Sequence, residues 1–306
     1  MILDEIVEKT KIRLEDRKKE KSFDMVKKEA LSIVEEPSKT TRIGDKIKIA
    51  NSEFNSIKNG QDSKQDKSKS KFEINDKLEK KIENNNFHFE KVLKSKEISF
   101  ICEVKKASPS KGIIAEEFPY LEIAKEYEKS GANAISVLTE PYFLKGEDKF
   151  LKEIASEVNI PVLRKDFVID EYMIYEAKTL GASAVLLICS ILNEETLKKY
   201  IKIADTLGLS ALVEAHDENE IKMALRAGAR IIGVNNRNLK DFTVNINNSI
   251  NLRKIVPADI IFIAESGIKT SEDIKELRKA KVNAVLVGET LMRSEDKRKA
   301  LEDLRG

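Results

Sequence analysis

The chain has 306 residues, and its 55 basic and 53 acidic side chains leave a net charge of only +2. This balance argues against nucleic-acid binding, which depends on a strong positive field, and two histidines are too few for a histidine-rich metal site, so we expect no nucleic-acid partner and no metal. Both cysteines lie inside apolar runs, and neither a signal peptide nor a span of about 20 apolar residues is present, so we expect a reduced, cytoplasmic protein with no membrane partner.

Residues 1–96 differ in pattern from the rest of the chain, and we expect them to form an N-terminal helical extension. Apolar residues in the first 34 positions recur at spacings that suit one or two amphipathic helices, which would pack on the domain that follows. Residues 35–86 carry too few apolar side chains to offset the entropy of ordering, so we predict a flexible insertion there, clearest at 55–70. A weak helical pattern returns at Ile74, Leu78 and Ile82. A lid that binds nucleic acid or a partner is the alternative, but the segment lacks interleaved aromatic residues and is not consistently basic.

Residues 97–306 alternate short β-branched runs with longer amphipathic ones, which indicates a parallel sheet with crossover helices. The eight short runs are 98–104, 133–139, 160–166, 183–189, 209–215, 230–235, 260–266 and 283–289. Helix ends repeat at Gly131, Gly181 and Gly228, where a C-cap needs a left-handed residue. Since the runs are apolar throughout, we expect strands covered on both faces and predict one (β/α)8 TIM barrel. An open doubly wound sheet would be unusually wide and would lack its GxGxxG turn.

Polar residues at the ends of these runs mark the predicted active site, because the active sites of parallel barrels form at the C-terminal ends of the strands. They are Glu103, Lys105, Lys165, Glu214, Asn235, Arg237 and Ser266. The strand period of two puts Glu103 and Lys105 on one face and Val104 on the other. Glu103, Lys165 and Glu214 end alternate strands, whose side chains share a layer, so we expect them to converge on one ligand. A buried lysine beside a glutamate also provides an acid and a base near neutral pH.

Two glycines follow the last two predicted strands, Gly267 in AESGI and Gly288 in VGET. Many barrels bind a phosphate in this region with backbone N–H groups and a helix N-terminus. With Lys105 and Ser108 expected nearby, the glycines favour a phosphorylated small molecule as the substrate.

Seven segments, in this order, resemble the indole-3-glycerol phosphate synthase family: EVKKASPSKG, ISVLTEPYFLKG, PVLRKDFVIDEYMIYEAKTLGA, LVEAH, GVNNRNL, AESGI and VGETLMR. The likeness runs from about residue 87 to the C-terminus, and MILDEIVEKTKIRLEDRK resembles the family's N-terminal helix. The resemblance implies a (β/α)8 carboxy-lyase of tryptophan biosynthesis that needs no cofactor. It would convert 1-(2-carboxyphenylamino)-1-deoxyribulose 5-phosphate to indole-3-glycerol phosphate, with release of carbon dioxide and water. Members of the family usually reach the first strand within about 50 residues, whereas nearly 100 precede it here.

The resemblance also implies catalytic roles. Lys165 matches the lysine that protonates the substrate carbonyl during ring closure. Glu214 and the pair Glu103 and Lys105 match residues that handle the protons of the dehydration. Asn235 matches a residue that orients the carboxylates and the substrate hydroxyls.

Binding roles follow in the same way. Arg237 matches a further residue of the site. The residues that match the phosphate end are Lys105, Ser108, Ser266, Gly267, Gly288 and Glu289. Those that match the apolar pocket for the anthranilate ring are Phe143, Phe167 and Leu186, whose aromatic members suit stacking. The loop SPSKG would close over the substrate and exclude water, with 109–112 as its mobile part.

Three alternatives are less favoured by the sequence. Phosphoribosylanthranilate isomerase acts on a related substrate with a cysteine and an aspartate, but Cys102 should face away from the barrel mouth and the sixth strand ends in Asn235. A regulatory, ligand-binding barrel would not need both lysines and both glutamates. His216, close to Glu214, would act as a proton relay if the strand end keeps it on the same face. We expect a monomer.

Overall fold

The structure is a computed structural model that describes residues 2–35, 87–108, 111–238 and 242–306. The predicted insertion, apart from Glu35 at the end of a helix, lies outside the described residues. So do two positions of the loop predicted to close over the substrate.

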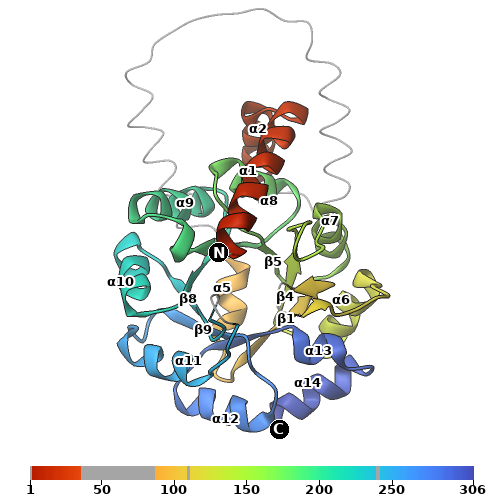
Figure 1. Cartoon of the computed structure of the whole chain (residues 1–306), viewed down its shortest axis with the longest axis vertical. Coiled ribbons are helices and arrows are strands. Elements are labelled where there is room, and N and C mark those ends of the chain that lie inside the picture. Colours follow the sequence, from red (N-terminus) through yellow and green to blue (C-terminus); the bar gives the residue numbers. More distant parts are fainter. Residues whose placement is uncertain (1, 36–86, 109–110, 239–241) are drawn as a thin grey trace, which may run out of the picture.

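Eight parallel strands close into a barrel in the order β1-β10-β9-β8-β7-β6-β5-β4, which confirms the predicted fold (Figure 1). The strands are β1 Ser99–Val104, β4 Ala134–Leu138, β5 Val162–Lys165, β6 Ala184–Ile188, β7 Ser210–Ala215, β8 Ile231–Asn235, β9 Ile261–Glu265 and β10 Ala284–Val287. Each lies within one of the eight apolar runs, and each run extends one or two residues beyond its strand at one or both ends.

Helices surround the strands (Figure 1). They are α6 Tyr120–Lys129, α7 Asp148–Glu157, α8 Glu171–Thr179, α9 Glu194–Thr206, α10 Glu218–Ala227, α11 Asn247–Leu252, α12 Ser271–Lys279, α13 Glu289–Arg293 and α14 Lys297–Arg305, with 3₁₀ turns η1 Cys189–Ile191 and η2 Arg253–Ile255. Several of these helices have an N-cap side chain that accepts a backbone hydrogen bond. On α12, the hydroxyl of Thr270 and the carboxylate of Asp273 form a reciprocal capping box. The predicted left-handed glycines are present, with φ of 82° at Gly131, 88° at Gly181 and 89° at Gly228.

The apolar core has two layers, one inside the barrel and one between the strands and the surrounding helices. Every second strand residue faces inward, and the inner layer includes Ile101, Leu163 and Leu212. Val104 and Cys102 belong to the outer layer between strands and helices, so the predicted orientation of Cys102 away from the mouth is confirmed.

A short helix, α5 (His88–Leu93), closes the N-terminal end of the barrel and appears in the centre of the ring in Figure 1. Its Phe89 and Leu93 are fully buried in the inner apolar layer. Its Glu90 accepts hydrogen bonds from Arg230, at 2.8 Å from Nη2, and from Ser210, which lie at the starts of β8 and β7. The sequence pattern did not reveal this plug, because six residues are too few to show a helical period.

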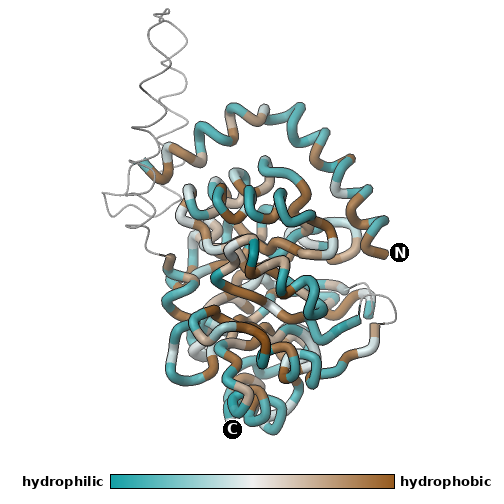
Figure 2. The backbone as a smooth tube through the Cα atoms, turned by 90° about the vertical axis from the view of Figure 1, so that its left-hand side faces the viewer, coloured by the Kyte–Doolittle hydropathy of each residue, from teal (hydrophilic) through white to brown (hydrophobic). Residues whose placement is uncertain are grey.

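Two helices, α1 (Ile2–Glu20) and α2 (Phe23–Glu35), are present where one or two were predicted. Helix α2 packs against α8, and Figure 2 shows the two N-terminal helices as an arch alongside the barrel with apolar and polar residues interleaved. The first residues of α1 reach the barrel mouth, where Ile2, Leu3 and Ile6 line a pocket.

The connection after β1 forms a small antiparallel hairpin of β2 (Ala107–Ser108) and β3 (Gly112–Ile113). No helix in the described part of the chain is both long and apolar enough to cross a membrane.

Candidate active site

A cluster of charges from β1 and β5 lies at the centre of the barrel mouth. Lys105 Nζ is 2.7 Å from Glu103 Oε2, and Lys165 Nζ is 3.8 Å from Glu103 Oε1, so one carboxylate bridges two ammonium groups. Burial alone would raise the pKa of Glu103, but the positive charges of Lys105 and Lys165 outweigh it and hold that pKa below its usual value. Burial would likewise lower the pKa of Lys165, but Glu103 and the other nearby carboxylates outweigh it and raise that pKa. Both groups are therefore charged at neutral pH.

Glu214 is the second-to-last residue of β7 and is almost fully buried. Its Oε1 atom lies 3.4 Å from the amide Nδ2 of Asn235, which ends β8, and 3.4 Å from Nε2 of His216. Asn235 also accepts the backbone N–H of Arg237 at 3.0 Å, so one side chain links the carboxylate to the loop that carries the arginine.

Glu265, the last residue of β9, is a site residue that sequence reasoning missed. It is 1% exposed, faces inward with Ile261 and Ile263, and its Oε1 atom has no hydrogen-bond partner. Burial, followed by the charge of Glu214, raises the pKa of Glu265 above its usual range, so it holds its proton more readily than an ordinary carboxyl group. A strand period of two counted from Ile261 would have found it, but only Ser266, one residue later, was selected.

Gly233 on β8 explains how Glu265 fits. A Cβ atom on Gly233 would lie 2.2 Å from Glu265 Oε1, so only glycine leaves room for this carboxyl group.

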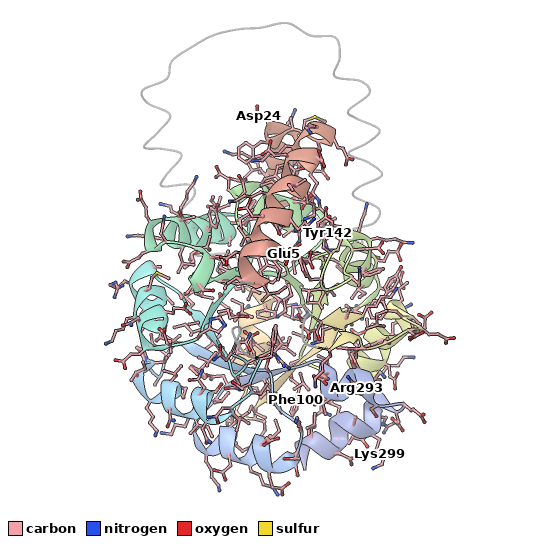
Figure 3. The ribbon with its side chains drawn as sticks, viewed as in Figure 1. Glu5, Asp24, Phe100, Tyr142, Arg293 and Lys299 are labelled. Atoms are coloured by element: carbon pink, nitrogen blue, oxygen red, sulfur yellow. The ribbon has the colours of Figure 1, made fainter. Side chains whose placement is uncertain are left out.

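A cavity of about 530 Å³ opens on one side of the cluster. It is lined by cationic side chains from several elements, Lys105, Lys111, Lys165, Arg237, Lys269 and Arg293. Lys111, which was not among the predicted site residues, is thus part of the cavity wall. In Figure 3, Arg293 on α13 and Glu5 on α1 lie on opposite sides of the ring of strands.

The predicted phosphate residues gather in this cavity, with one exception. Ser266, Gly267, Gly288 and Glu289 line it, and Glu289 lies 3.7 Å from Arg237. Ser266 and Gly267 have φ of 66° and 82°, a tight turn that is costly for the serine and typical of functional sites. The exception, Ser108, does not line this cavity.

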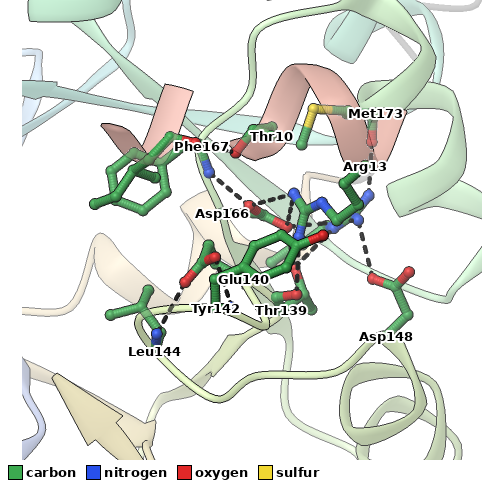
Figure 4. Close-up of polar contacts among 12 residues, drawn as sticks. Thr10, Arg13, Thr139, Glu140, Tyr142, Leu144, Asp148, Asp166, Phe167 and Met173 are labelled. Carbon is green, nitrogen blue, oxygen red and sulfur yellow. Dashed lines mark hydrogen bonds and ion pairs between the residues drawn. The ribbon is translucent and has the colours of Figure 1, made fainter. Parts of the chain in front are cut away.

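An adjoining pocket of about 140 Å³ has an apolar wall. The apolar residues that line it are Ile2, Leu3, Ile6, Leu138, Leu144, Phe167, Leu186, Ile188 and Phe242. Phe167 and Leu186, two of the residues predicted to contact an aromatic ring, line this pocket, and Ser108 lines it instead of the cationic cavity. Phe143 is half-buried on the loop after β4 and does not line the pocket, although its neighbour Leu144 does. The Glu140 carboxylate fixes this loop by accepting the backbone N–H groups of Phe143 and Leu144, each at 2.8 Å. Figure 4 shows the bond from Leu144.

A buried ion pair joins α1 to the strand that carries Lys165. Arg13 Nη2 donates to both oxygens of Asp166 at 2.9 and 3.0 Å, and Asp166 also accepts from Thr139 Oγ1 at 2.7 Å (Figure 4). Arg164, which precedes Lys165 in the chain, is fully buried and donates to Thr139 and to the Met173 carbonyl. Both chain neighbours of Lys165 are therefore held in place.

Unpaired polar atoms identify the same region independently. Among the described residues, buried side-chain polar atoms without a partner are Ser108 Oγ, Ser136 Oγ, His216 Nε2 and Glu265 Oε1. Three belong to pocket-lining residues of the mouth, and Ser136 pairs in register with Glu103 on the next strand. Buried polar groups are normally satisfied, so their concentration here indicates a site built for a polar ligand. The described part of the chain holds no group of three or more His, Cys, Asp or Glu side chains placed to bind a metal ion.

Comparisons with known proteins agree on one family. The family model described as "Indole-3-glycerol phosphate synthase" matches residues 54–304. A protein of that name from Ruminiclostridium cellulolyticum is 52% identical over 306 residues, covering 100% of this chain and 99% of that protein. Another from Lachnoclostridium phytofermentans is 48% identical over 305 residues, covering 100% and 99%.

A solved structure supports the fold alone. The 3-hexulose-6-phosphate synthase from Salmonella typhimurium is 15% identical, with a TM-score of 0.56 over 68% of this chain and 96% of that one.

Proposed function

We propose that this chain, which belongs to the indole-3-glycerol phosphate synthase family, carries out that family's reaction in its barrel mouth. The enzyme is a carboxy-lyase of tryptophan biosynthesis. It forms the indole ring of indole-3-glycerol phosphate from 1-(2-carboxyphenylamino)-1-deoxyribulose 5-phosphate and releases carbon dioxide and water.

The substrate phosphate binds in the cationic cavity. A dianion there faces Lys105, Arg237 and Arg293, together with the backbone N–H groups of the turn at Gly267 and of Gly288. Several fixed positive charges in a partly buried cavity are worth more to a phosphate than the same charges in water.

The aromatic ring binds in the apolar pocket, against Phe167 and Leu186 and under the start of α1. This places the substrate carbonyl between the two ends, beside Lys165. Lys165 donates a proton to the carbonyl oxygen while the ring carbon forms the new carbon–carbon bond. Loss of the carboxylate as carbon dioxide then restores the aromatic ring.

Dehydration follows at the same cluster. The hydroxyl group leaves as water with a proton from the site, and a carboxylate accepts the proton that the product loses. Glu103, Lys105 and Glu214 handle these protons, and Asn235 orients Glu214. Glu265, with its raised pKa, adds a carboxyl group able to donate a hydrogen bond within the cluster.

The observation that carries the proposal is that Lys165 and Glu103 line both the cationic cavity and the apolar pocket. One continuous site therefore has a phosphate end, an aromatic end and an acid–base pair where they meet. This order of groups matches the order of groups along the substrate.

The test is to supply the carboxyphenylamino-deoxyribulose phosphate and follow indole fluorescence. Turnover is expected in the full chain, and Lys165→Met should abolish it while the circular dichroism spectrum stays unchanged. Lys199→Met is the matched control, because Lys199 is 57% exposed on α9 and far from the chemistry. Absence of product from the full chain would refute the function, and near-normal turnover in Lys165→Met would refute the role of the lysine.

We also propose that the barrel of residues 97–306 carries the chemistry and that the N-terminal extension completes its apolar pocket. Contacts of Ile2, Leu3 and Ile6 with that pocket support this division.

A further inference from the structure

His216 lies between two carboxylates that come from different elements. Its Nδ1 atom is 3.1 Å from Glu220 Oε2 on α10, and its backbone N–H donates to the same oxygen at 2.7 Å. Its Nε2 atom points the other way, is buried without a hydrogen-bond partner, and lies 3.4 Å from Glu214 Oε1. The imidazole thus bridges a helix residue and a strand-end residue of the active site.

Charged side chains from several elements lie around His216. Glu220 on α10, Glu214 on β7 and Glu265 on β9 interact with it electrostatically, and Asp217 and Arg237 line the same cavity. A polar cavity of about 580 Å³ opens beside it. Carboxylates outnumber the one cation, so a protonated imidazole is the form that this environment favours.

We propose that His216 is a positioning residue that, as an imidazolium anchored by Glu220, holds Glu214 in the orientation that the ring-forming reaction uses. The inference deepens the proposed function and rests on it.

The geometry explains why the contact matters. His216 Nε2 and Asn235 Nδ2 both approach the same oxygen of Glu214, Oε1, each at 3.4 Å. Two donors on one oxygen fix the plane of the carboxylate and leave Oε2 for the substrate. Separations of this length shorten when a ligand completes a site.

The charges around His216 also support this role, because they favour its protonated form. Burial would lower the pKa of His216, but the hydrogen bond to Glu220 and the charges of Glu214 and Glu265 outweigh it and raise that pKa to about 9. The imidazole is then charged at neutral pH and loses its proton as the pH rises through about 9. A role limited to packing would need no such charge.

The first part of the test needs no activity. The chain has only two histidines, so His88→Gln, which replaces an exposed residue, leaves His216 as the one imidazole signal in an NMR titration. The expected midpoint is about 9. Glu220→Gln should lower it, because the amide oxygen still accepts the hydrogen bonds but carries no charge. Glu218→Gln is the matched control, since Glu218 lies on the same turn, is 56% exposed and pairs with Lys222.

The second part is kinetic. His216→Leu should lower kcat about 10- to 100-fold, with KM changed by less than about 3-fold. This is less than the ~10²–10⁴-fold that a general acid or base contributes, because His216 acts only through Glu214. His216→Gln keeps a donor toward Glu214 and should restore part of the loss. In the wild type, kcat should fall as the pH rises through about 9, and Glu220→Gln should move this limb to lower pH.

The outcomes separate the two proposals. Suppose that the wild-type chain turns the substrate over. The inference alone would then be overturned if His216 titrated near the ordinary value of about 6.5, or if His216→Leu left kcat unchanged. A wild-type chain without turnover would overturn the proposed function, and the inference with it, even if the midpoint were near 9. If His216→Leu failed to fold, the Glu220→Gln pH profile would decide.

Discussion

The ion pair between Arg13 and Asp166 allows a prediction that joins stability to catalysis. Replacing Arg13 by methionine keeps most of the side-chain volume but removes both hydrogen bonds to Asp166. The carboxylate then stays buried at 0% exposure beside Lys165. We expect α1 to dock less firmly on the barrel mouth.

The expected loss of stability in Arg13→Met depends on the hydrogen bonds that Asp166 keeps. Removing one partner of a buried pair costs about 3–5 kcal/mol because the other charge remains uncompensated. Asp166 retains bonds from Thr139 Oγ1 at 2.7 Å and from the Phe167 N–H at 2.8 Å, and Arg164 lies 3.8 Å away. We therefore expect a loss near the low end of that range, about 3 kcal/mol. Arg13→Lys should also destabilise, since an ammonium cannot reproduce the two-pronged contact.

Urea unfolding followed by circular dichroism measures the loss, and steady-state kinetics measures its effect on the site. The start of α1 lines the apolar pocket, so KM should rise in Arg13→Met. Lys11→Met on the same helix is the control. Lys11 pairs with Glu8 at 58% and 67% exposure, and such surface pairs contribute no more than about 1 kcal/mol.

The pH dependence supplies a second check. Arg13 and Arg164 outweigh the effect of burial and lower the pKa of Asp166. A carboxyl group with a lowered folded pKa stabilises above its unfolded pKa of about 3.9 and stops doing so as the pH falls through the folded value. The difference between wild type and Arg13→Met should be constant from neutral pH down to about 5 and shrink below about 4. A loss below about 0.5 kcal/mol at neutral pH would refute the reasoning, because it would class the contact with surface pairs.

Three further predictions concern other parts of the molecule. Glu265→Gln should raise the free energy of unfolding by about 0.5–2 kcal/mol at pH 8 and not at pH 4, because a carboxyl group with a raised folded pKa costs stability only above its ordinary pKa. Thermal unfolding at both pH values measures this difference, and an equal gain at both would contradict the prediction. Gly288→Ala should lower kcat at least about 10-fold, because the new Cβ would lie 2.2 Å from Glu103 Oε2 and displace it; unchanged kinetics would show that the carboxylate has room to move. Deleting residues 40–80 should leave turnover unchanged if that segment is a passive insertion, and a large loss would identify it as a functional lid.

The barrel could be predicted from the sequence because each strand is buried on both faces. Burial of this kind leaves continuous apolar runs, and left-handed glycines such as Gly181 mark where the helices stop. The short plug α5 escaped prediction, because its contacts are with residues far along the chain, such as Arg230, 140 positions away.

Strand periodicity predicted some residues of the candidate site and missed others. Glu103 and Lys105 were predicted to share a face, and their contact at 2.7 Å confirms that they do. Glu265 was missed because the end of an apolar run was taken one residue late. The part played by Arg13 could not be predicted, since nothing local in α1 distinguishes this buried cation from exposed ones such as Lys11 and Lys19.

The plug and the N-terminal helices fix the two ends of the intervening segment independently of its length. Helix α2 is anchored on α8 outside the barrel, and α5 is anchored inside its N-terminal end. Loop-closure entropy grows only with the logarithm of length, so doubling such a connection costs about 0.6 kcal/mol. We therefore expect that residues can be added to or removed from this segment with little change in the stability of the barrel, as long as the chain still joins the two anchors.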